Sequence, residues 1–416
     1  MPPIATSTRR RRTALAAAAV VAALAVTTTA CGADGGSGSG DKQPSDSETQ
    51  AQKPGGDLRD RLPKDLPKDL PTSLEDLHKW KNGEWKNWDR KQWLREAQDF
   101  VNPIIEDLWK PGRMKDADEN DGKKDDRQVD DSDIDKSPSG GDNGTGEDEG
   151  VTDPTPPKVA AKPVKTPYTQ NAGPVGKVFM DTPEGPMVCS GTVVKDPRHP
   201  GKSNMVATAG HCVHAGKKGG WFRNVVFVPQ YNPNGMSNAE LESAQQKDVA
   251  PHGVWWAKYA RTTTHWIDNG STTGGGGAPQ DFAVMKVQPE QASATGKSLE
   301  ESVGDAAQVN FHTPRVKSVR SLQANGYPAA PPFDGSKMYN CTDKPGRITL
   351  DANQPTMYRI GCTMTGGSSG GGWLSPSGKQ LLSVTSIGPV DGGWLSGPRL
   401  GSQAKSVFDG VSKQQD

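Results

Sequence analysis

The sequence predicts an all-β domain over residues 164–416, preceded by a long polar region with little structure of its own. Three observations support this prediction. The apolar runs after residue 164 are short, Gly and Pro residues separate them, and a helical pattern occurs only at residues 239–247 and 402–411. Many short strands with turn signals between them are typical of a β-barrel or a β-sandwich.

The predicted strands follow one another through the domain. Val, Leu, Ile, Met and Ala recur in these runs, and the β-branched side chains among them pack well on a pleated sheet. In chain order the runs are residues 175–180, 187–194, 204–209, 225–229, 282–287, 319–324, 357–362 and 381–387. The domain spans about 250 residues, which is enough for one hydrophobic core.

The N-terminus has the pattern of an export signal over residues 1–31. A basic cluster at residues 9–12 precedes an apolar run at residues 14–26, and small residues follow. The apolar run is too short for a comfortable membrane-spanning helix. The paired arginines leave open whether the general or the twin-arginine export route is used.

Cys31 is a candidate lipidation site. It follows Ala30 and precedes a Gly/Ser tract, which resembles a bacterial lipoprotein signal, although Thr28 stands where Leu is usual. Ordinary cleavage after Ala30 is the alternative. The chain has 5 Cys, and if the 4 in the C-terminal part form bridges, lipidation accounts for the one left over. Bridges are the expected state in an oxidising compartment.

Composition indicates that residues 32–160 form a largely disordered linker. The whole chain of 416 residues is only 32% hydrophobic, which is low for a fully globular protein. Residues 116–150 hold 14 acidic and 4 basic residues and no apolar core. The net charge of the chain is zero, so its charge does not predict a nucleic-acid partner.

A Trp-rich island at about residues 74–110 interrupts the linker. Apolar side chains recur there at three- and four-residue steps, an amphipathic helical pattern that Pro103 would kink or split. The segment is expected to pack on the folded domain or on itself. An envelope-surface or partner-binding helix and a propeptide are the alternatives.

Three short motifs in the domain supply the groups of a nucleophilic hydrolase. Their key residues are His211 within residues 208–212, Asp281 at the start of residues 281–285, and Ser369 within residues 367–371. A serine hydroxyl needs a base within hydrogen-bond reach, and the base needs an orienting carboxylate. Asp268 is the alternative carboxylate, and Ser368 is the alternative nucleophile.

These motifs resemble those of the trypsin-like serine proteases. Cys189-Ser190-Gly191-Thr192, Thr208-Ala209-Gly210-His211-Cys212 and Gly367-Ser368-Ser369-Gly370-Gly371 are similar to the signatures of that family, in the chain order His, Asp, Ser. The resemblance covers roughly residues 175–410. It implies two six-stranded β-barrels, a chymotrypsin-like double barrel, and acyl transfer without cofactor or metal.

The resemblance also implies roles for further residues. Bridges are expected between Cys189 and Cys212 and between Cys341 and Cys362, and the backbone amides of Gly367 and Ser369 would form an oxyanion hole. Thr363, not an Asp, stands at the family's pocket-floor position, so a strong Lys or Arg preference is not expected. Thr385 stands on the strand where glutamyl-specific relatives place a His, and Asp391 in a nearby loop could still reach the pocket. Substrate backbone is expected to pair with Ser386 to Gly388 as an added strand.

One position departs from the trypsin pattern. Ser368 stands where trypsin-like zymogens carry an Asp that captures a new N-terminal amine. That activation switch is therefore expected to be absent, as in bacterial glutamyl-endopeptidase-like relatives, which also have a Ser at this position.

Together, the patterns predict an exported bacterial serine endopeptidase, monomeric, secreted or anchored to the outer face of the cell membrane through Cys31. Its partners would be protein or peptide substrates. The alternative is a catalytically inactive, protease-like surface binding protein.

Overall fold

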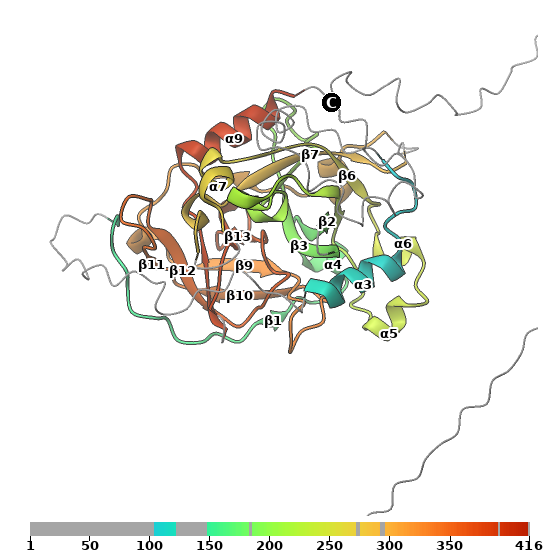
Figure 1. Ribbon diagram of the computed structural model, residues 1–416. Coiled ribbons are helices and arrows are strands. Elements are labelled where there is room, and N and C mark those ends of the chain that lie inside the picture. Colours follow the sequence, from blue (N-terminus) through green and yellow to red (C-terminus); the bar gives the residue numbers. More distant parts are fainter. Residues whose placement is uncertain are drawn as a thin grey trace, which may run out of the picture. The chain divides into compact units, whose positions relative to one another are not determined.

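The computed structural model describes residues 104–121, 148–182, 185–271, 275–291, 296–389 and 392–414. The predicted export signal, Cys31 and most of the predicted linker, residues 32–103 and 122–147, lie outside these residues. Two β-barrels form the body of the described part (Figure 1).

The first barrel is a closed ring of six antiparallel strands. Their order around the ring is β2-β3-β4-β7-β6-β5. The strands are β2 (Val175–Thr182), β3 (Gly185–Val194), β4 (Met205–Thr208), β5 (Arg223–Pro229), β6 (Trp255–Thr262) and β7 (Ala283–Pro289). Alternate side chains of β2 enter different cores: Val178 joins one and Phe179 the other, as expected from the two-residue period of a strand.

The second barrel consists of two sheets around a shared core. One sheet has the order β1-β10-β9-β13-β14-β8 and the other the order β11-β12-β15. The strands that build both sheets are β1 (Lys162–Pro163), β8 (Gln308–Val309), β9 (Leu322–Gly326), β10 (Tyr339–Asp343), β11 (Gly346–Ile348), β12 (Met357–Cys362), β13 (Gly372–Leu374), β14 (Gln380–Val384) and β15 (Gly393–Gly397). A disulfide between Cys341 of β10 and Cys362 of β12 joins the two sheets. The predicted chymotrypsin-like double barrel is confirmed.

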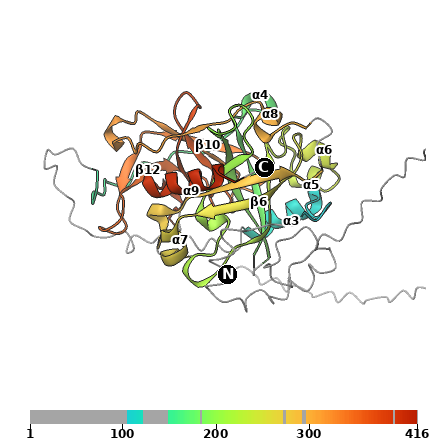
Figure 2. The same cartoon turned by 90° about the horizontal axis from the view of Figure 1, so that it is seen from above.

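Short helices and helical turns connect the strands. They are α4 (Tyr168–Asn171), α5 (Asn238–Leu241), α6 (Gln246–Val249), α7 (Thr264–Asn269), α8 (Leu299–Val303) and the 3₁₀ turns η3 (Gly210–Cys212), η4 (Gly216–Lys218), η5 (Ala278–Gln280) and η6 (Val316–Ser318). The longer α9 (Ser402–Ser412) packs on β6 and β7 (Figure 2). The predicted helical pattern at residues 402–411 coincides with α9, whereas the one at residues 239–247 is divided between the short helices α5 and α6. Among the described residues, no helix is long and apolar enough to cross a membrane.

The prediction of a disordered linker is wrong for two described stretches, residues 111–121 and 148–160. Residues 104–110 instead belong to the island that was expected to pack on the folded domain or on itself. Residues 104–121 pack on the first barrel and end in α3 (Pro111–Asp121). Residues 104–110, the described end of the predicted helical island, form a turn. The physical reason is Pro111, which disfavours helical backbone at the residue before it but suits the first position of a helix.

Residues 148–163 form the second ordered stretch, here called the strap. Asp148 is buried and forms an ion pair with Arg399 (3.2 Å). Asp153 accepts two hydrogen bonds from the Arg347 guanidinium, at 3.0 and 2.7 Å. Burial raises the pKa of Asp153, but the hydrogen bonds and charge of Arg347 outweigh this, and the net pKa is lowered. These partners lie far along the chain, so local composition could not show them.

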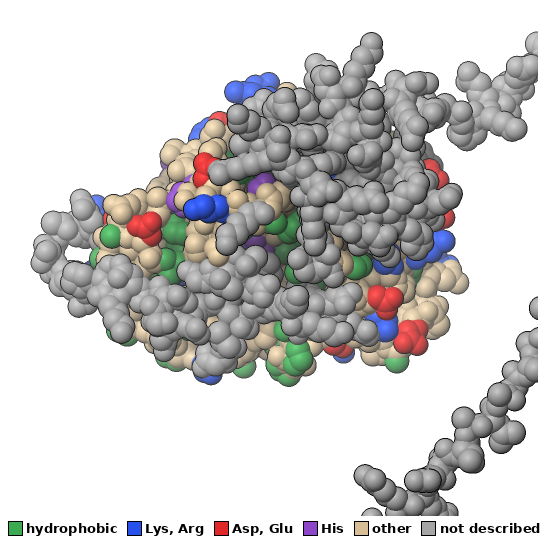
Figure 3. Space-filling model, viewed as in Figure 1, with side chains coloured by type: hydrophobic (Ala, Val, Ile, Leu, Met, Phe, Trp, Pro, Cys, Tyr) green, Lys and Arg blue, Asp and Glu red, His purple; other side chains and the backbone are tan. Residues whose placement is uncertain are grey.

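Charged side chains of both signs are interspersed on the described surface visible in Figure 3, without one dominant patch on that face. This distribution agrees with the zero net charge of the chain.

Candidate active site

His211 lies in a tight turn at the end of β4. The strand ends at Thr208, and Gly210–Cys212 form the 3₁₀ turn η3. The predicted Cys189–Cys212 disulfide is present and closes a span of 23 residues between β3 and this turn. By the loss of loop entropy in the unfolded chain, such a bridge contributes about 3 kcal/mol to stability.

Asp281 holds the His211 turn through two hydrogen bonds. Its Oδ2 lies 2.6 Å from His211 Nδ1, and its Oδ1 accepts from the His211 backbone amide at 2.9 Å. Both side chains are almost fully buried. A carboxylate in this position keeps the proton on Nδ1, which leaves Nε2 as the basic nitrogen.

Ser386 contributes a third hydrogen bond to the same carboxylate. Its hydroxyl donates to Asp281 Oδ2 at 2.6 Å, across the boundary between the two barrels. From the sequence, Ser386 was expected only to pair with the substrate backbone, and its hydrogen bond to Asp281 was missed. No local signal could have found it, because Ser386 and Asp281 are 105 residues apart.

The loop that carries Ser369 is fixed against the first barrel. The Ser190 amide donates to the Ser369 carbonyl at 2.7 Å, and the Ser190 hydroxyl donates to the Gly367 carbonyl at 2.9 Å. Since Ser190 follows the bridged Cys189, the Ser369 loop and the His211 turn share one anchor. Gly370 fits tightly here: its φ is +74°, and an added Cβ would lie 2.9 Å from the Ala209 amide nitrogen.

Two amides of this loop remain available to bind an oxyanion. The Gly366 carbonyl accepts from the Ala329 amide (2.6 Å), and the Ser368 carbonyl accepts from the Gly371 amide (3.0 Å). In a trans peptide the N–H points away from the C=O, so the amides of Gly367 and Ser369 face the opposite way. Neither donates a hydrogen bond to another described residue.

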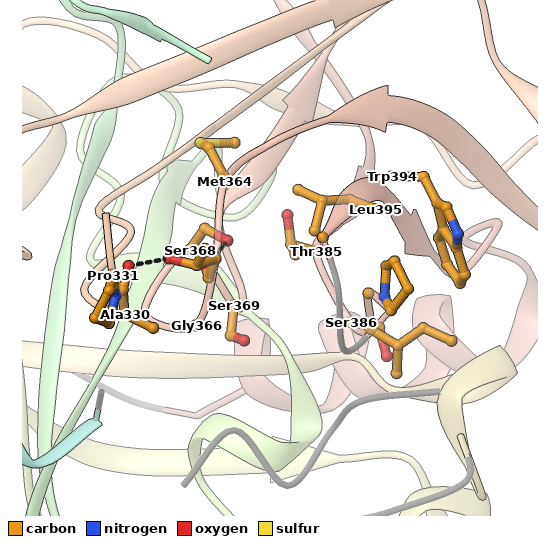
Figure 4. Close-up of a pocket in the computed structure, with 15 residues that line it drawn as sticks. Ala330, Pro331, Met364, Gly366, Ser368, Ser369, Thr385, Ser386, Trp394 and Leu395 are labelled. Carbon is orange, nitrogen blue, oxygen red and sulfur yellow. Dashed lines mark hydrogen bonds between the residues drawn. The ribbon is translucent and has the colours of Figure 1, made fainter. Parts of the chain in front are cut away.

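Ser368 is buried and turned into its own loop. Its hydroxyl donates to the Thr365 carbonyl at 2.6 Å (Figure 4). The loop is thus held by a neutral local hydrogen bond, at the position where trypsin-like zymogens need an ion pair.

A small pocket opens beside Ser369. Figure 4 shows Ala330, Pro331 and Ser368 on one side and Thr385, Leu395 and Trp394 on the other. Its cavity volume is about 120 Å³, below the roughly 300–1,000 Å³ typical of small-molecule sites. It therefore suits a single side chain. No charged side chain is among the described residues that line it.

The predicted substrate-binding residues divide into two groups. Thr385, Ser386 and Gly388 line the pocket, whereas Thr363 does not. The Thr363 hydroxyl instead accepts a hydrogen bond from the Ala161 amide of the strap at 2.9 Å. The neighbouring Met364 lines the pocket in its place, because successive side chains of an extended chain point to opposite sides.

One group of described residues, His211 with Cys189 and Cys212, has potential metal donor atoms within 4.8 Å of one another. Both sulfurs are in the disulfide, so neither can act as the thiolate ligand that zinc prefers.

Only glycine fits at position 210, because three side chains occupy the space where a Cβ would lie. An added Cβ would lie 2.5 Å from Thr262 Oγ1, 2.8 Å from Trp266 Cγ and 2.9 Å from Asp281 Oδ1. We expect Gly210→Ala to displace Asp281 from His211 and to lower kcat/KM by roughly 10- to 100-fold. Steady-state hydrolysis of a peptide substrate measures this. Gly173→Ala, whose Cβ meets no atom closer than 3.9 Å, should retain activity, and an equal loss in both variants would refute the steric argument.

His214, three residues beyond His211, is a buried structural histidine. Its Nδ1 accepts from the Gly216 amide at 3.0 Å, and its ring packs edge-on against Trp221. Burial lowers the pKa of His214 from 6.5 to about 3. The neutral ring is therefore the form that the fold accommodates.

This pKa predicts a loss of stability in acid. Between pH 6.5 and about 3, the unfolded chain binds a proton at His214 that the folded chain does not, so the free energy of unfolding falls as pH falls. From pH 7 to pH 5 the loss is about 2 kcal/mol. Urea unfolding at both pH values should show this loss reduced in His214→Asn and unchanged in His312→Asn, a substitution at an exposed histidine. An identical pH dependence in His214→Asn would contradict the assignment.

The fold and the site together define the class of this protein. It is a chymotrypsin-like double-barrel protein with a buried His–Asp pair next to a loop serine. His211 and Asp281 lie on the first barrel, and Ser369 and Ser386 lie on the second. No protein family and no curated protein matches the sequence. Solved structures of serine proteases do match.

Three of these structures are between 16% and 30% identical in sequence to this chain. The thermostable serine protease AL20 from an extremophilic microorganism is 30% identical, over 59% of this chain and 99% of that chain, with a TM-score of 0.48. The protease Anisep from Arthrobacter nicotinovorans is 28% identical, over 61% and 99%, with a TM-score of 0.47. A Glu endopeptidase solved in complex with MPD is 16% identical, over 62% and 98%, with a TM-score of 0.44.

Proposed function

We propose that this protein is a serine endopeptidase of the trypsin-like superfamily that hydrolyses peptide bonds through Ser369, His211 and Asp281. The observation that carries the proposal is the hydrogen-bonded chain from Ser386 through Asp281 to His211, with distances of 2.6 Å at both steps. A buried carboxylate and imidazole in this arrangement, next to a serine loop held by Ser190, suit general-base activation of a hydroxyl.

In the proposed reaction, His211 Nε2 accepts the proton of the Ser369 hydroxyl as its oxygen attacks the substrate carbonyl carbon. The carbonyl oxygen becomes an oxyanion that accepts hydrogen bonds from the amides of Gly367 and Ser369. The protonated His211 then gives its proton to the leaving amine, which leaves an acyl-enzyme on Ser369. Water, deprotonated by His211, releases the acid product and restores the serine.

We propose that the pocket beside Ser369 receives the substrate side chain on the acyl side of the scissile bond. The neutral lining around Met364 and Trp394 supports an uncharged, apolar side chain. Substrate backbone would pair with Ser386 to Gly388 as an added strand. Ser386 thus has two proposed contacts: its backbone to substrate and its hydroxyl to Asp281.

Labelling by a fluorophosphonate tests the proposal, because the reagent phosphonylates a serine only when a base and an oxyanion hole activate it. We expect rapid labelling of the purified protein, loss of labelling in Ser369→Ala, and retention in the matched control Ser368→Ala. Labelling that survives in Ser369→Ala but disappears in Ser368→Ala would assign the nucleophile to the preceding residue. A wild-type protein that takes no label would instead be a protease-like binding protein.

We also propose that the protein is exported and acts as a secreted protein or on the outer face of a bacterial membrane, with Cys31 as its lipid anchor. The two disulfides support an oxidising compartment. Mass spectrometry of the mature N-terminus separates a lipidated Cys31 from cleavage after Ala30 without lipid, and a retained residue 1 would contradict export by this signal.

A further inference from the structure

The outer face of the first barrel is unusually apolar. In β5, Val225 and Phe227 join one core, while Val226 and Val228 join the other. On β2 and β3, Phe179 and Val188 extend the second core. A strand with apolar side chains on both faces is typically covered on both. Uncovered, these side chains would form an exposed apolar patch, which is unusual on a soluble protein.

Residues 104–121 supply part of this cover. Trp109 and Met114 are 0% exposed, and Ile105 and Leu108 are each 5% exposed, although these residues lie near one end of the described chain. The Trp109 ring packs on Phe179 with ring centres 5.4 Å apart. α3 lies along β3 and near α5 (Figure 1). The segment therefore places its apolar side chains in the core shared with the barrel.

Specific polar contacts fix the position of Trp109. Its indole Nε1 donates to the Asn224 carbonyl at 2.7 Å, and its own carbonyl accepts from Gln246 Nε2 at 3.1 Å. The Arg113 guanidinium lies 3.9 Å from the Trp109 ring centre and forms an ion pair with Asp181 at 2.5 Å. A buried aromatic anchor with satisfied polar contacts and a neighbouring arginine is typical of the few residues that dominate a binding interface.

We propose that residues 104–121 form a separable docking segment, which binds the outer face of the first barrel through its own contacts and not because the chain connects it. On the side of the docking segment, all of these contacts come from 18 consecutive residues. The segment is therefore short enough to be made as a synthetic peptide. A cut in the chain between residues 122 and 147 would then leave two chains held together. Everything before residue 104, including any membrane anchor, would stay attached to the barrels.

The full-length protein with a site for a sequence-specific protease inserted between Asp130 and Asp131 tests this directly. After complete cleavage, confirmed by denaturing gel, we expect the N-terminal fragment to co-elute with the barrels in size-exclusion chromatography and to separate only in denaturant. Separate elution of the two fragments from the folded, cut wild-type protein would overturn the proposal, whatever the variants do.

Variants then test the anchor. Trp109→Ala should release the fragment at least 100-fold faster, as measured by exchange against an excess of synthetic peptide 104–121. The matched control is Lys110→Ala, which removes an exposed side chain of the same segment and should release it at the wild-type rate. If Trp109→Ala fails to fold, Arg113→Ala replaces it with an expected release at least 10-fold faster. Equal release rates in all variants would refute Trp109 and Arg113 as the anchor.

Discussion

Asp281→Asn is expected to lower kcat for peptide hydrolysis by about 10⁴-fold with little change in the fold. The Asp281 carboxylate accepts three hydrogen bonds, from the His211 ring, the His211 amide and the Ser386 hydroxyl. An asparagine side chain offers one oxygen and an N–H₂ donor, so it cannot accept all three. An amide nitrogen facing His211 would favour the ring tautomer with its proton on Nε2, which cannot accept a proton from Ser369.

Two matched variants sharpen this test. Asp268→Asn replaces the other carboxylate that the sequence offers, and it should keep kcat within about 3-fold of wild type, since the carboxylate at His211 Nδ1 is that of Asp281. Ser386→Ala should cost roughly 10- to 100-fold, the effect of one hydrogen bond to a buried charge. A large loss in Asp268→Asn with none in Asp281→Asn would reject the assigned triad.

Substrates with an apolar residue on the acyl side of the scissile bond should be cleaved at least about 100-fold faster, by kcat/KM, than those with Lys or Glu there. The described part of the pocket lining is neutral, with Met364, Trp394 and Leu395 among its side chains, so it favours an apolar substrate group over a charged one, which would lose its hydration on entering. Peptides that differ only at this residue measure the effect. A preference for Lys or for Glu would contradict it.

Trp394→Ala provides the matched test of the pocket wall. Trp394 lines the pocket. The Arg359 guanidinium forms a cation–π contact with it, 5.5 Å from the ring centre. The variant should lose more kcat/KM on a substrate with Leu or Phe at this residue than on one with Ala, because only the large side chain reaches the indole. An equal loss on both substrates would indicate a general disturbance of the site.

The local chemistry of the site was readable from short motifs. The sequence placed His211, Asp281 and Ser369 in segments rich in small residues, because such motifs depend on a few neighbouring residues. Both disulfides were expected from the resemblance to the trypsin-like proteases, and both are present. The strand pattern predicted β2, β3, β4, β5, β7 and β12 to within two residues at each end. β6, which begins with Trp255 and Trp256 and is largely buried, was missed, as were β10, β11, β13 and β15.

Contacts across long separations could not be predicted in this way. Ser386 lies on the second barrel and Asp281 on the first, while Met364, rather than Thr363, faces the pocket because of one register step on an extended chain. Residues 111–121 and 148–160 look unstructured by local composition, yet both are ordered by partners more than 60 residues away.

The sequence by itself determined the strand-rich class of the domain and the chemical groups of the site, because these depend on residue type and on short-range spacing, whereas the cysteine pairing was expected from the resemblance to a known family. Only the tertiary structure decided which side chains meet across the two barrels, how a neutral pocket forms beside Ser369, and that Trp109 is buried against the first barrel. Those outcomes depend on register and on burial between distant segments, and neither quantity is encoded within a local window of the chain.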